Sequence, residues 1–243
     1  MADEPAARTN APERTVATRV SLDPTRRTIA ARLGESYRDA VHVTVQRDIE
    51  ASALLEADAT LEDAGREGSI VDIVLLALSD ALTEHPRFNA TFDGDALTLY
   101  HEHNVAVAVD TDRGLLAPVL DDVRGRSIEA IHRQRTELTN RVIAGDHSMA
   151  DLSGGTITIT NLGPFGIDLF TPIINPPQVA IVSLNRLRRR VVLTDDNTPT
   201  AVTDLPVGVT FDHRAVDGAD AARLLASMAA ALVDADALIA GDG

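Results

Sequence analysis

The amino-acid sequence predicts one mixed α/β (α+β) domain. Segments in which apolar and polar residues alternate, such as 41–45 and 156–160, are typical of strands with one buried face. Between such segments lie longer ones, such as 70–84, whose length and apolar pattern favour helices. The sequence has no internal repeat and no second domain boundary, so these elements are expected to share one core.

The N-terminal segment differs in composition from the rest of the chain. Residues 1–20 are rich in Ala, Pro, Arg and Glu and predict a flexible arm, which leaves 21–243 for the folded domain. The dipeptide Asp23-Pro24 predicts the first helix, because a carboxylate before a proline is a common helix start.

The remaining elements follow from apolar periodicity and from turn residues. Ser69 is expected to cap the helix 70–84, which is apolar on nearly all sides and therefore buried. Further helices are predicted at 51–64, 127–144 and 219–238. Further strands are predicted at 105–109, 179–184, 190–193 and 207–211.

Two connecting regions carry their own signals. Asp93-Gly94 is typical of a hairpin turn and predicts a hairpin over 88–100. Residues 163–177 form a loop rich in Gly and Pro, and loops of this length are uncommon unless they are functional or pack at an interface.

The charge composition limits the class of partner. The net charge is -15, which argues against a nucleic-acid groove, and all 22 basic residues are arginine. An acidic excess without lysine favours a protein adapted to high salt, where screening weakens self-repulsion. The alternative is a GC-rich genome that encodes Arg in place of Lys, although this leaves the acidity unexplained.

Cysteine content and hydropathy exclude several further classes. The chain has no cysteine, so disulfides, cysteine metal sites and a cysteine nucleophile are excluded. No apolar run reaches the roughly 18 residues needed to span a bilayer. The polar N-terminus has no signal-peptide core, so no membrane partner and a cytoplasmic location are expected.

The stretch TFDHRAVDGAD, residues 210–220, concentrates ionisable groups where an apolar strand is predicted to end. A neutral imidazole at His213 could act as a general base, with Asp217 orienting the site. The alternatives are a satisfied core histidine, a helix cap at Asp217 and an ordinary surface pair of Asp212 with Arg214. A metal site is not expected, because His213 and Asp217 supply only two ligands.

This stretch resembles the DHRxxDG signature of the acyltransferase cores of 2-oxoacid dehydrogenase complexes. Six further blocks resemble that family in the same order, over roughly residues 22–238. They are RRTIAARLGES, VHVT, FNATFD, NVAVAVDTDRGLLAPVL, DLSGGTITITNLGPFG and FTPIINPPQVAI. The resemblance implies a fold like that of chloramphenicol acetyltransferase, with a mixed sheet flanked by helices. It also implies trimers with active sites between subunits.

The resemblance further implies the reaction and its residues. An acyl group moves between a dihydrolipoyl thiol and coenzyme A. His213 would deprotonate the attacking thiol, Asp217 would maintain the local hydrogen bonds, and the Thr160 hydroxyl would donate to the oxyanion. Without the resemblance to this family, we would expect the Thr160 hydroxyl to bond to its own backbone at the end of a strand. The resemblance places Ser69, Asp110, Thr160 and Asn161 in the coenzyme A site, while Ser69 as a helix cap and Asp110 as a turn residue are equally good interpretations.

Some features depart from the family and bear on its partners. Only about 20 residues precede the core, so the lipoyl group is expected from another chain, a lipoyl-bearing protein working with 2-oxoacid dehydrogenase components. The helix after the first strand lacks a basic residue to meet coenzyme A. Two interpretations are open for four arginines near a predicted strand. They could contact the coenzyme A phosphates, or they could be ordinary solvated residues at the end of the strand (Arg186, Arg188, Arg189 and Arg190). A homotrimer is expected, and the C-terminal sequence leaves a larger cage open.

The leading hypothesis is therefore a dihydrolipoamide acyltransferase. Two alternatives stay open, namely a non-catalytic assembly protein of such a complex and an acyltransferase with a different acceptor, such as an amine or alcohol. The joint presence of His213, Asp217 and Thr160 argues against the assembly protein, because a scaffold does not need all three.

Overall fold

The computed structural model describes residues 14–112 and 114–240. A mixed seven-stranded sheet dominates it, in which β8 runs parallel to β4 and β9 and the other neighbours are antiparallel. The strand order is β1 (His42–Glu50), β11 (Pro199–Asp212), β9 (Ala180–Leu184), β8 (Ile157–Asn161), β4 (Val105–Val107) and β7 (Val119–Leu120). β10 (Arg188–Leu193) pairs with the outer part of β11. The predicted class, a mixed α/β fold with a mixed sheet flanked by helices, is confirmed.

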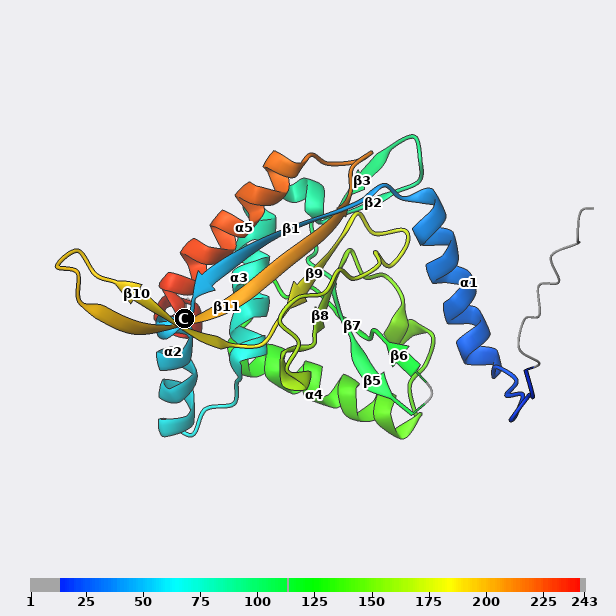
Figure 1. Cartoon of the computed structure of the whole chain (residues 1–243), viewed down its shortest axis with the longest axis horizontal. Coiled ribbons are helices and arrows are strands. Elements are labelled where there is room, and N and C mark those ends of the chain that lie inside the picture. Colours follow the sequence, from blue (N-terminus) through cyan, green and yellow to red (C-terminus); the bar gives the residue numbers. More distant parts are fainter. Residues whose placement is uncertain (1–13, 113, 241–243) are drawn as a thin grey trace, which may run out of the picture.

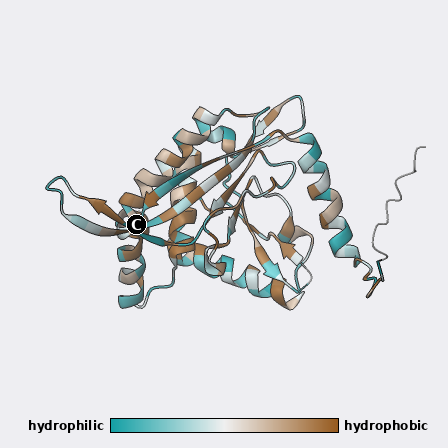
Figure 2. Cartoon of the chain, in the orientation of Figure 1, coloured by the Kyte–Doolittle hydropathy of each residue, from teal (hydrophilic) through white to brown (hydrophobic). Residues whose placement is uncertain are grey.

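The helices lie mainly on one face of this sheet (Figure 1). Helix α3 (Ile70–Glu84) is mostly buried and is coloured mostly hydrophobic in Figure 2, as its sequence predicts. It packs with α5 (Gly218–Val233), which also contacts β1 and β11. The remaining helices are α1 (Pro24–Asp39), α2 (Ser52–Asp63), α4 (Ile128–Ala144) and α6 (Ala235–Ala240). Short 3₁₀ turns occur at Pro86–Phe88, Ala150–Leu152 and Gly163–Phe165.

The two faces of the sheet differ in chemistry. Alternate side chains point to opposite faces of a strand, and Ile159 and Val209 belong to the hydrophobic core against the helices. Their neighbours Thr160 and Thr210 therefore lie on the other face, which is polar. On this polar face, the hydroxyl groups of Thr44 and Thr210 are hydrogen-bonded at 2.7 Å across β1 and β11. We call it the polar face of the sheet.

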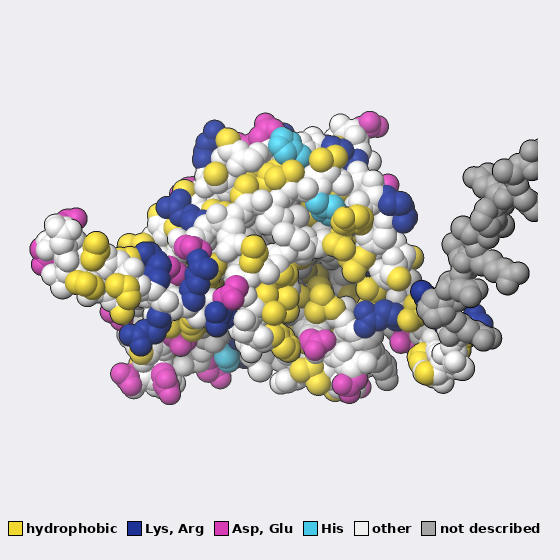
Figure 3. Space-filling model, viewed as in Figure 1, with side chains coloured by type: hydrophobic (Ala, Val, Ile, Leu, Met, Phe, Trp, Pro, Cys, Tyr) yellow, Lys and Arg dark blue, Asp and Glu magenta, His cyan; other side chains and the backbone are white. Residues whose placement is uncertain are grey.

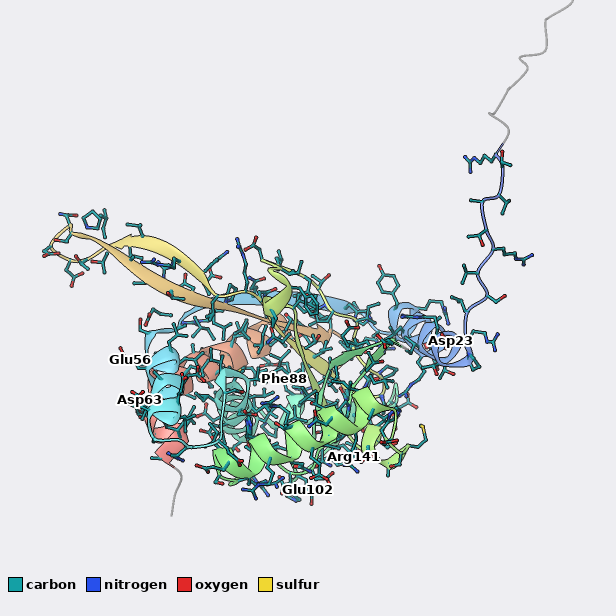
Figure 4. All side chains as sticks on the ribbon, turned by 90° about the horizontal axis from the view of Figure 1, so that it is seen from below. Asp23, Glu56, Asp63, Phe88, Glu102 and Arg141 are labelled. Atoms are coloured by element: carbon teal, nitrogen blue, oxygen red, sulfur yellow. The ribbon has the colours of Figure 1, made fainter. Side chains whose placement is uncertain are left out.

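Several elements differ from their predicted extents. The run 105–109 is two strands, because β5 (Val109–Thr111) leaves the main sheet and pairs with β6 (Gly114–Leu116). β11 has 14 residues, since its outer part forms an arm with β10 that projects from the body in Figure 4. The last helix is broken at Asp234. The predicted hairpin is confirmed as β2 (Ala90–Phe92) and β3 (Leu97–Leu99).

The N-terminal prediction is tested only in part. Residues 1–13 of the predicted arm lie outside the described residues, and 14–23 form neither helix nor strand. The Asp23 carboxylate accepts a hydrogen bond from the backbone N–H of Arg26 at 2.9 Å, so the predicted helix start is confirmed. No helix in the described ranges is long and apolar enough to cross a bilayer.

Candidate active site

The chain turns sharply after β11, and Asp212 shapes this turn. The residue is 3% exposed, and its carboxylate accepts hydrogen bonds from the backbone N–H groups of Arg214 and Val41, at 3.0 and 3.2 Å. It also pairs with the Arg214 guanidinium at 2.6 Å. Asp212 and Arg214 are therefore not an ordinary surface pair. They form a clamp that holds the residue between them, His213, in a defined place.

The charges of this clamp are fixed near neutral pH. Burial alone would raise the pKa of Asp212, but hydrogen bonds from Arg214 and Val41 and the charge of Arg214 outweigh it and lower the pKa. The guanidinium also lies over the Phe92 ring, 5.1 Å from its centre. A permanently charged pair therefore flanks His213.

The His213 ring is accessible to a substrate. Its side chain is 44% exposed, while its backbone N–H donates to the carbonyl of Val41 at 2.9 Å. The ring centre lies 5.8 Å from that of the buried Phe211. A satisfied core histidine, one alternative left open by the sequence, is therefore not what the structure contains.

Asp217 lies beside this ring at the start of α5. Its Oδ1 is 3.7 Å from Nδ1 of His213, which is beyond normal hydrogen-bond length. Asp217 is also the N-cap residue of α5, and the Asp220 carboxylate accepts a hydrogen bond from its backbone N–H at 3.4 Å. The two sequence interpretations of Asp217, helix cap and partner of His213, are therefore compatible.

Thr160 lies near the end of β8 on the polar face. The residue is 7% exposed, and no hydrogen bond of its hydroxyl to another described residue is found. The alternative in which this hydroxyl bonds to its own backbone is therefore absent. The next residue, Asn161, accepts a hydrogen bond from the backbone N–H of Gly163 at 2.8 Å. The Thr160 hydroxyl is thus available to a ligand.

One protomer does not bring Thr160 and His213 together. Thr160 is paired with Ser183, and Ser183 with Gly208, so Thr160 is level with Gly208 on β11. His213 follows Gly208 by five residues, which corresponds to about 17 Å along the strand, with about 10 Å more across two strand spacings. No single acyl group can contact both side chains of one protomer.

The other residues predicted to bind coenzyme A fall in two places. β4 and β8 are adjacent and parallel, so their carboxyl ends bring Asp110, Thr160 and Asn161 to the same end of the sheet. Ser69 lies elsewhere, at the start of α3, where its hydroxyl donates to the Asp72 carboxylate at 2.7 Å. No described hydrogen bond joins Ser69 to the strand ends.

Asp72 organises a polar cluster between α3 and α4. It is fully buried and accepts hydrogen bonds from Arg135, at 2.5 and 2.9 Å, and bonds to Nδ1 of His132 at 2.8 Å. Burial raises the pKa of Asp72, but the hydrogen bonds and charge of Arg135, with help from Ser69 and His132, lower it overall. The Ser69 hydroxyl is therefore occupied by a structural cluster rather than by capping α3.

Three of the four arginines near β10 are paired with carboxylates, while Arg189 is exposed and has no ion pair with another described residue. Arg186 pairs with Asp168, Arg188 with Asp48 and Arg190 with Asp204. Figure 3 shows arginine and acidic side chains mixed at the base of the β10–β11 arm, beside a hollow lined mostly by hydrophobic side chains. Among the described residues, no group of three or more histidine, aspartate or glutamate side chains could hold a metal ion.

Comparison with known sequences identifies the family. Residues 14–240 match the family described as 2-oxoacid dehydrogenases acyltransferase (catalytic domain). The chain is 34% identical over 212 residues to the dihydrolipoyllysine-residue acetyltransferase component of the pyruvate dehydrogenase complex of Zymomonas mobilis, covering 86% of this chain and 48% of the relative. It is also 34% identical to a succinyltransferase component of the 2-oxoglutarate dehydrogenase complex of Rickettsia bellii, covering 85% and 53%. The chain thus spans about half the length of these relatives.

Solved structures agree with this result. A dihydrolipoamide acetyltransferase of Azotobacter vinelandii, studied for the role of a serine, a histidine and an asparagine in its mechanism, superposes with a TM-score of 0.84 at 28% identity, covering 94% and 99% of the two chains. The cubic core of a pyruvate dehydrogenase complex gives 0.84 at 27% identity and the same coverage. A chloramphenicol acetyltransferase gives 0.54 at 13% identity, covering 83% and 94%, and supports the fold alone.

The fold is of the chloramphenicol acetyltransferase class, a mixed sheet flanked by helices. Within that class, the chain belongs to the family of 2-oxoacid dehydrogenase acyltransferase catalytic domains.

Sequence reasoning did not find two features of the site. It left the Asp212–Arg214 clamp as a surface pair, because burial of Asp212 depends on the pairing of β1 with β11. It also did not single out Ser183 and Gly208, which lie in line with Thr160. The available signal was the alternation of Thr, Ser and Gly with apolar residues along β8, β9 and β11.

Proposed function

We propose that this chain is a coenzyme A-dependent acyltransferase that moves an acyl group between a dihydrolipoyl thiol and coenzyme A in a 2-oxoacid dehydrogenase complex. The observation that carries the proposal is the half-exposed His213 ring, held by the Asp212–Arg214 clamp with Asp217 at 3.7 Å. Further support comes from relatives that are acetyl- and succinyltransferase components of such complexes.

In the proposed mechanism, both thiols belong to substrates. The His213 imidazole takes the proton of the attacking thiol, whose ordinary pKa is about 8.5, and the thiolate adds to the thioester carbonyl. The Thr160 hydroxyl donates a hydrogen bond to the resulting oxyanion. The intermediate collapses, the other sulfur leaves, and the imidazolium returns the proton to it. No enzyme thiol is required, which agrees with the absence of cysteine.

The separation of Thr160 and His213 favours a site shared between two copies of the chain. His213 of one protomer would then face the Thr160 surface of its neighbour, with the two thiols held between them. We propose a homotrimer, able to build a larger core like the cubic one to which this chain is similar. The lipoyl arm is proposed to come from another chain, a lipoyl-bearing protein that works with 2-oxoacid dehydrogenase components.

We also propose a cytoplasmic, salt-adapted protein. The support is a net charge of -15 in a chain without lysine. Because the acceptor class is inferred from relatives, an acyltransferase for amines or alcohols is an alternative outcome of the experiment below.

The test is an assay of the purified protein in high salt, with dihydrolipoamide and a panel of acyl-coenzyme A thioesters. His213→Ala should lower the turnover number by roughly 10²–10⁴-fold and leave the oligomer intact. His101→Ala, which changes an exposed histidine in a surface bend, is the matched control and should keep parental turnover. Equal turnover by the His213 variant and the parent would exclude the base assignment. An oligomer that transfers no acyl group to any acceptor would favour an assembly protein.

A further inference from the structure

Ser183, in the middle of β9, has a hydroxyl that the proposed mechanism does not use. The residue is 0% exposed, and its Oγ has no hydrogen-bond partner among the described residues. An unsatisfied buried hydroxyl costs stability, and most such groups in folded proteins are paired. This hydroxyl is therefore a candidate for a hydrogen bond that forms only when the protein carries out its reaction.

The sheet places Thr160 beside Ser183. The two residues are register partners on the adjacent parallel strands β8 and β9, so their side chains point to the same polar face. On the other side of Ser183 lies Gly208, which has no side chain. A Cβ added at Gly208 would come within 2.5 Å of Ser183 Oγ, so the hydroxyl now leans over the glycine.

Burial decides which of the two hydroxyls can reach a substrate. Thr160 is 7% exposed and Ser183 is 0% exposed, so Ser183 lies behind the surface that Thr160 presents. Ser183 therefore cannot contact a substrate directly in this arrangement. It can act through Thr160, whose own hydroxyl has no described partner.

We infer that Ser183 is a positioning residue for acyl transfer, whose hydroxyl donates to Oγ1 of Thr160 while Thr160 donates to the oxyanion. The inference rests on the proposed function. Rotation about the single χ1 bond of Ser183 carries the hydroxyl from above Gly208 toward Thr160. A hydroxyl that donates becomes a better acceptor, so the two hydrogen bonds strengthen each other as negative charge develops. The pair would orient the Thr160 proton toward the developing oxyanion.

The test is a double-mutant cycle on the assembled protein, with dihydrolipoamide and acetyl-coenzyme A as substrates. Ser183→Ala should lower kcat by about 3- to 10-fold, the effect of one neutral hydrogen bond, with KM for the coenzyme within about twofold. In a Thr160→Val background the same substitution should cause no further loss of kcat, because Ser183 acts through the Thr160 hydroxyl and that hydroxyl is absent. Ser183→Cys, with a weaker donor of similar size, should give an intermediate kcat.

The matched control is Ser79→Ala. Ser79 is also buried, but its hydroxyl is bonded to Nδ1 of His103 at 2.8 Å and lies on α3. This substitution should lower the melting temperature and leave kcat unchanged. Ser183→Ala should instead lower kcat and leave the melting temperature unchanged, because removing an unpaired hydroxyl does not weaken the fold.

Two results would overturn the inference while leaving the proposed function intact. One is an active parent whose kcat is unchanged by Ser183→Ala. The other is an equal loss of kcat from Ser183→Ala with and without the Thr160 hydroxyl. If the folded parent itself transfers no acyl group, the proposed function fails, and the role of Ser183 fails with it.

Discussion

Thr160 on β8 is level with Gly208 on β11, and His213 follows Gly208 by five residues, directly after the end of β11. This relationship places the available hydroxyl and the accessible imidazole of one protomer about 17 Å apart along the strands. Both groups lack a reaction partner within their own protomer. A symmetric assembly provides the simplest arrangement in which each imidazole faces a hydroxyl.

Mixed oligomers give a direct test of this arrangement. Oligomers made only of His213→Ala chains, or only of Thr160→Val chains, should have little activity. Oligomers re-formed from a mixture of both should regain a substantial fraction, because some interfaces then join an intact histidine to an intact threonine. The measurement is the acyl-transfer rate before and after mixing under dissociating conditions. No recovery in verified mixed oligomers would mean that each site lies within one chain.

Substitution of Thr160 separates catalysis from binding. Thr160→Val keeps the shape of the side chain and removes its hydroxyl, so kcat should fall by about 10²–10³-fold, as for other oxyanion donors. KM for the coenzyme should change little, because the hydrogen bond forms mainly in the transition state. Steady-state kinetics measures both quantities. A rise in KM at constant kcat would show that the hydroxyl contributes to binding alone.

The Asp212–Arg214 clamp should affect activity by holding His213 in position, and neither residue should take part in the reaction itself. Asp212→Asn leaves Arg214 without its carboxylate and weakens the turn that holds His213. We expect kcat to fall by roughly tenfold, because small misplacements of a catalytic group are costly. Arg223→Gln, which breaks an exposed pair with Asp220 on α5, is the control and should have little effect. Parental kcat in Asp212→Asn would contradict a positioning role.

The Asp72 cluster should govern stability in acid. Its pKa is lowered in the folded state, so its contribution is fully present above the unfolded pKa of about 3.9 and is lost as pH falls through the folded pKa. Asp72→Asn leaves Arg135 half-paired in the interior and should cost about 3–5 kcal/mol near pH 7.

Denaturant unfolding of parent and variant between pH 7 and pH 3 checks this prediction. The difference in free energy of unfolding should shrink as the pH falls below about 4. A difference that stays constant over this range would mean that the cluster is not held by the charge of Asp72.

Salt should stabilise the protein near neutral pH. At a net charge of -15, self-repulsion destabilises the compact state, and about 1 M salt reduces its range to about 3 Å. We expect the free energy of unfolding to rise from 0.1 to 3 M KCl at pH 7. The increase should be much smaller near the isoelectric point of about 4.7. Full stability in dilute buffer at pH 7 would contradict salt adaptation.

Several parts of the fold and site follow from local sequence alone. Asp23-Pro24 begins α1, the apolar pattern of 70–84 forms the buried α3, and Asp93-Gly94 turns a hairpin. These elements depend on contacts between residues near in sequence, which propensity and periodicity describe well. The candidate base was also accessible to sequence reasoning, because His213 and Asp217 are four residues apart.

The relations between distant strands were not accessible in this way. Period-two alternation indicates which residues share a face, but it does not say which strands are neighbours or in what register. The break between β4 and β5, the burial of Asp212 and the alignment of Ser183 with Thr160 all depend on pairing across the sheet. The sequence by itself determined most helices and the candidate base, because contacts between residues near in the chain specify them, while the role of Thr160 rested on the resemblance to a family. Only the tertiary structure decided that Thr160 and His213 of one protomer lie apart, because strand register is set by packing of the whole core.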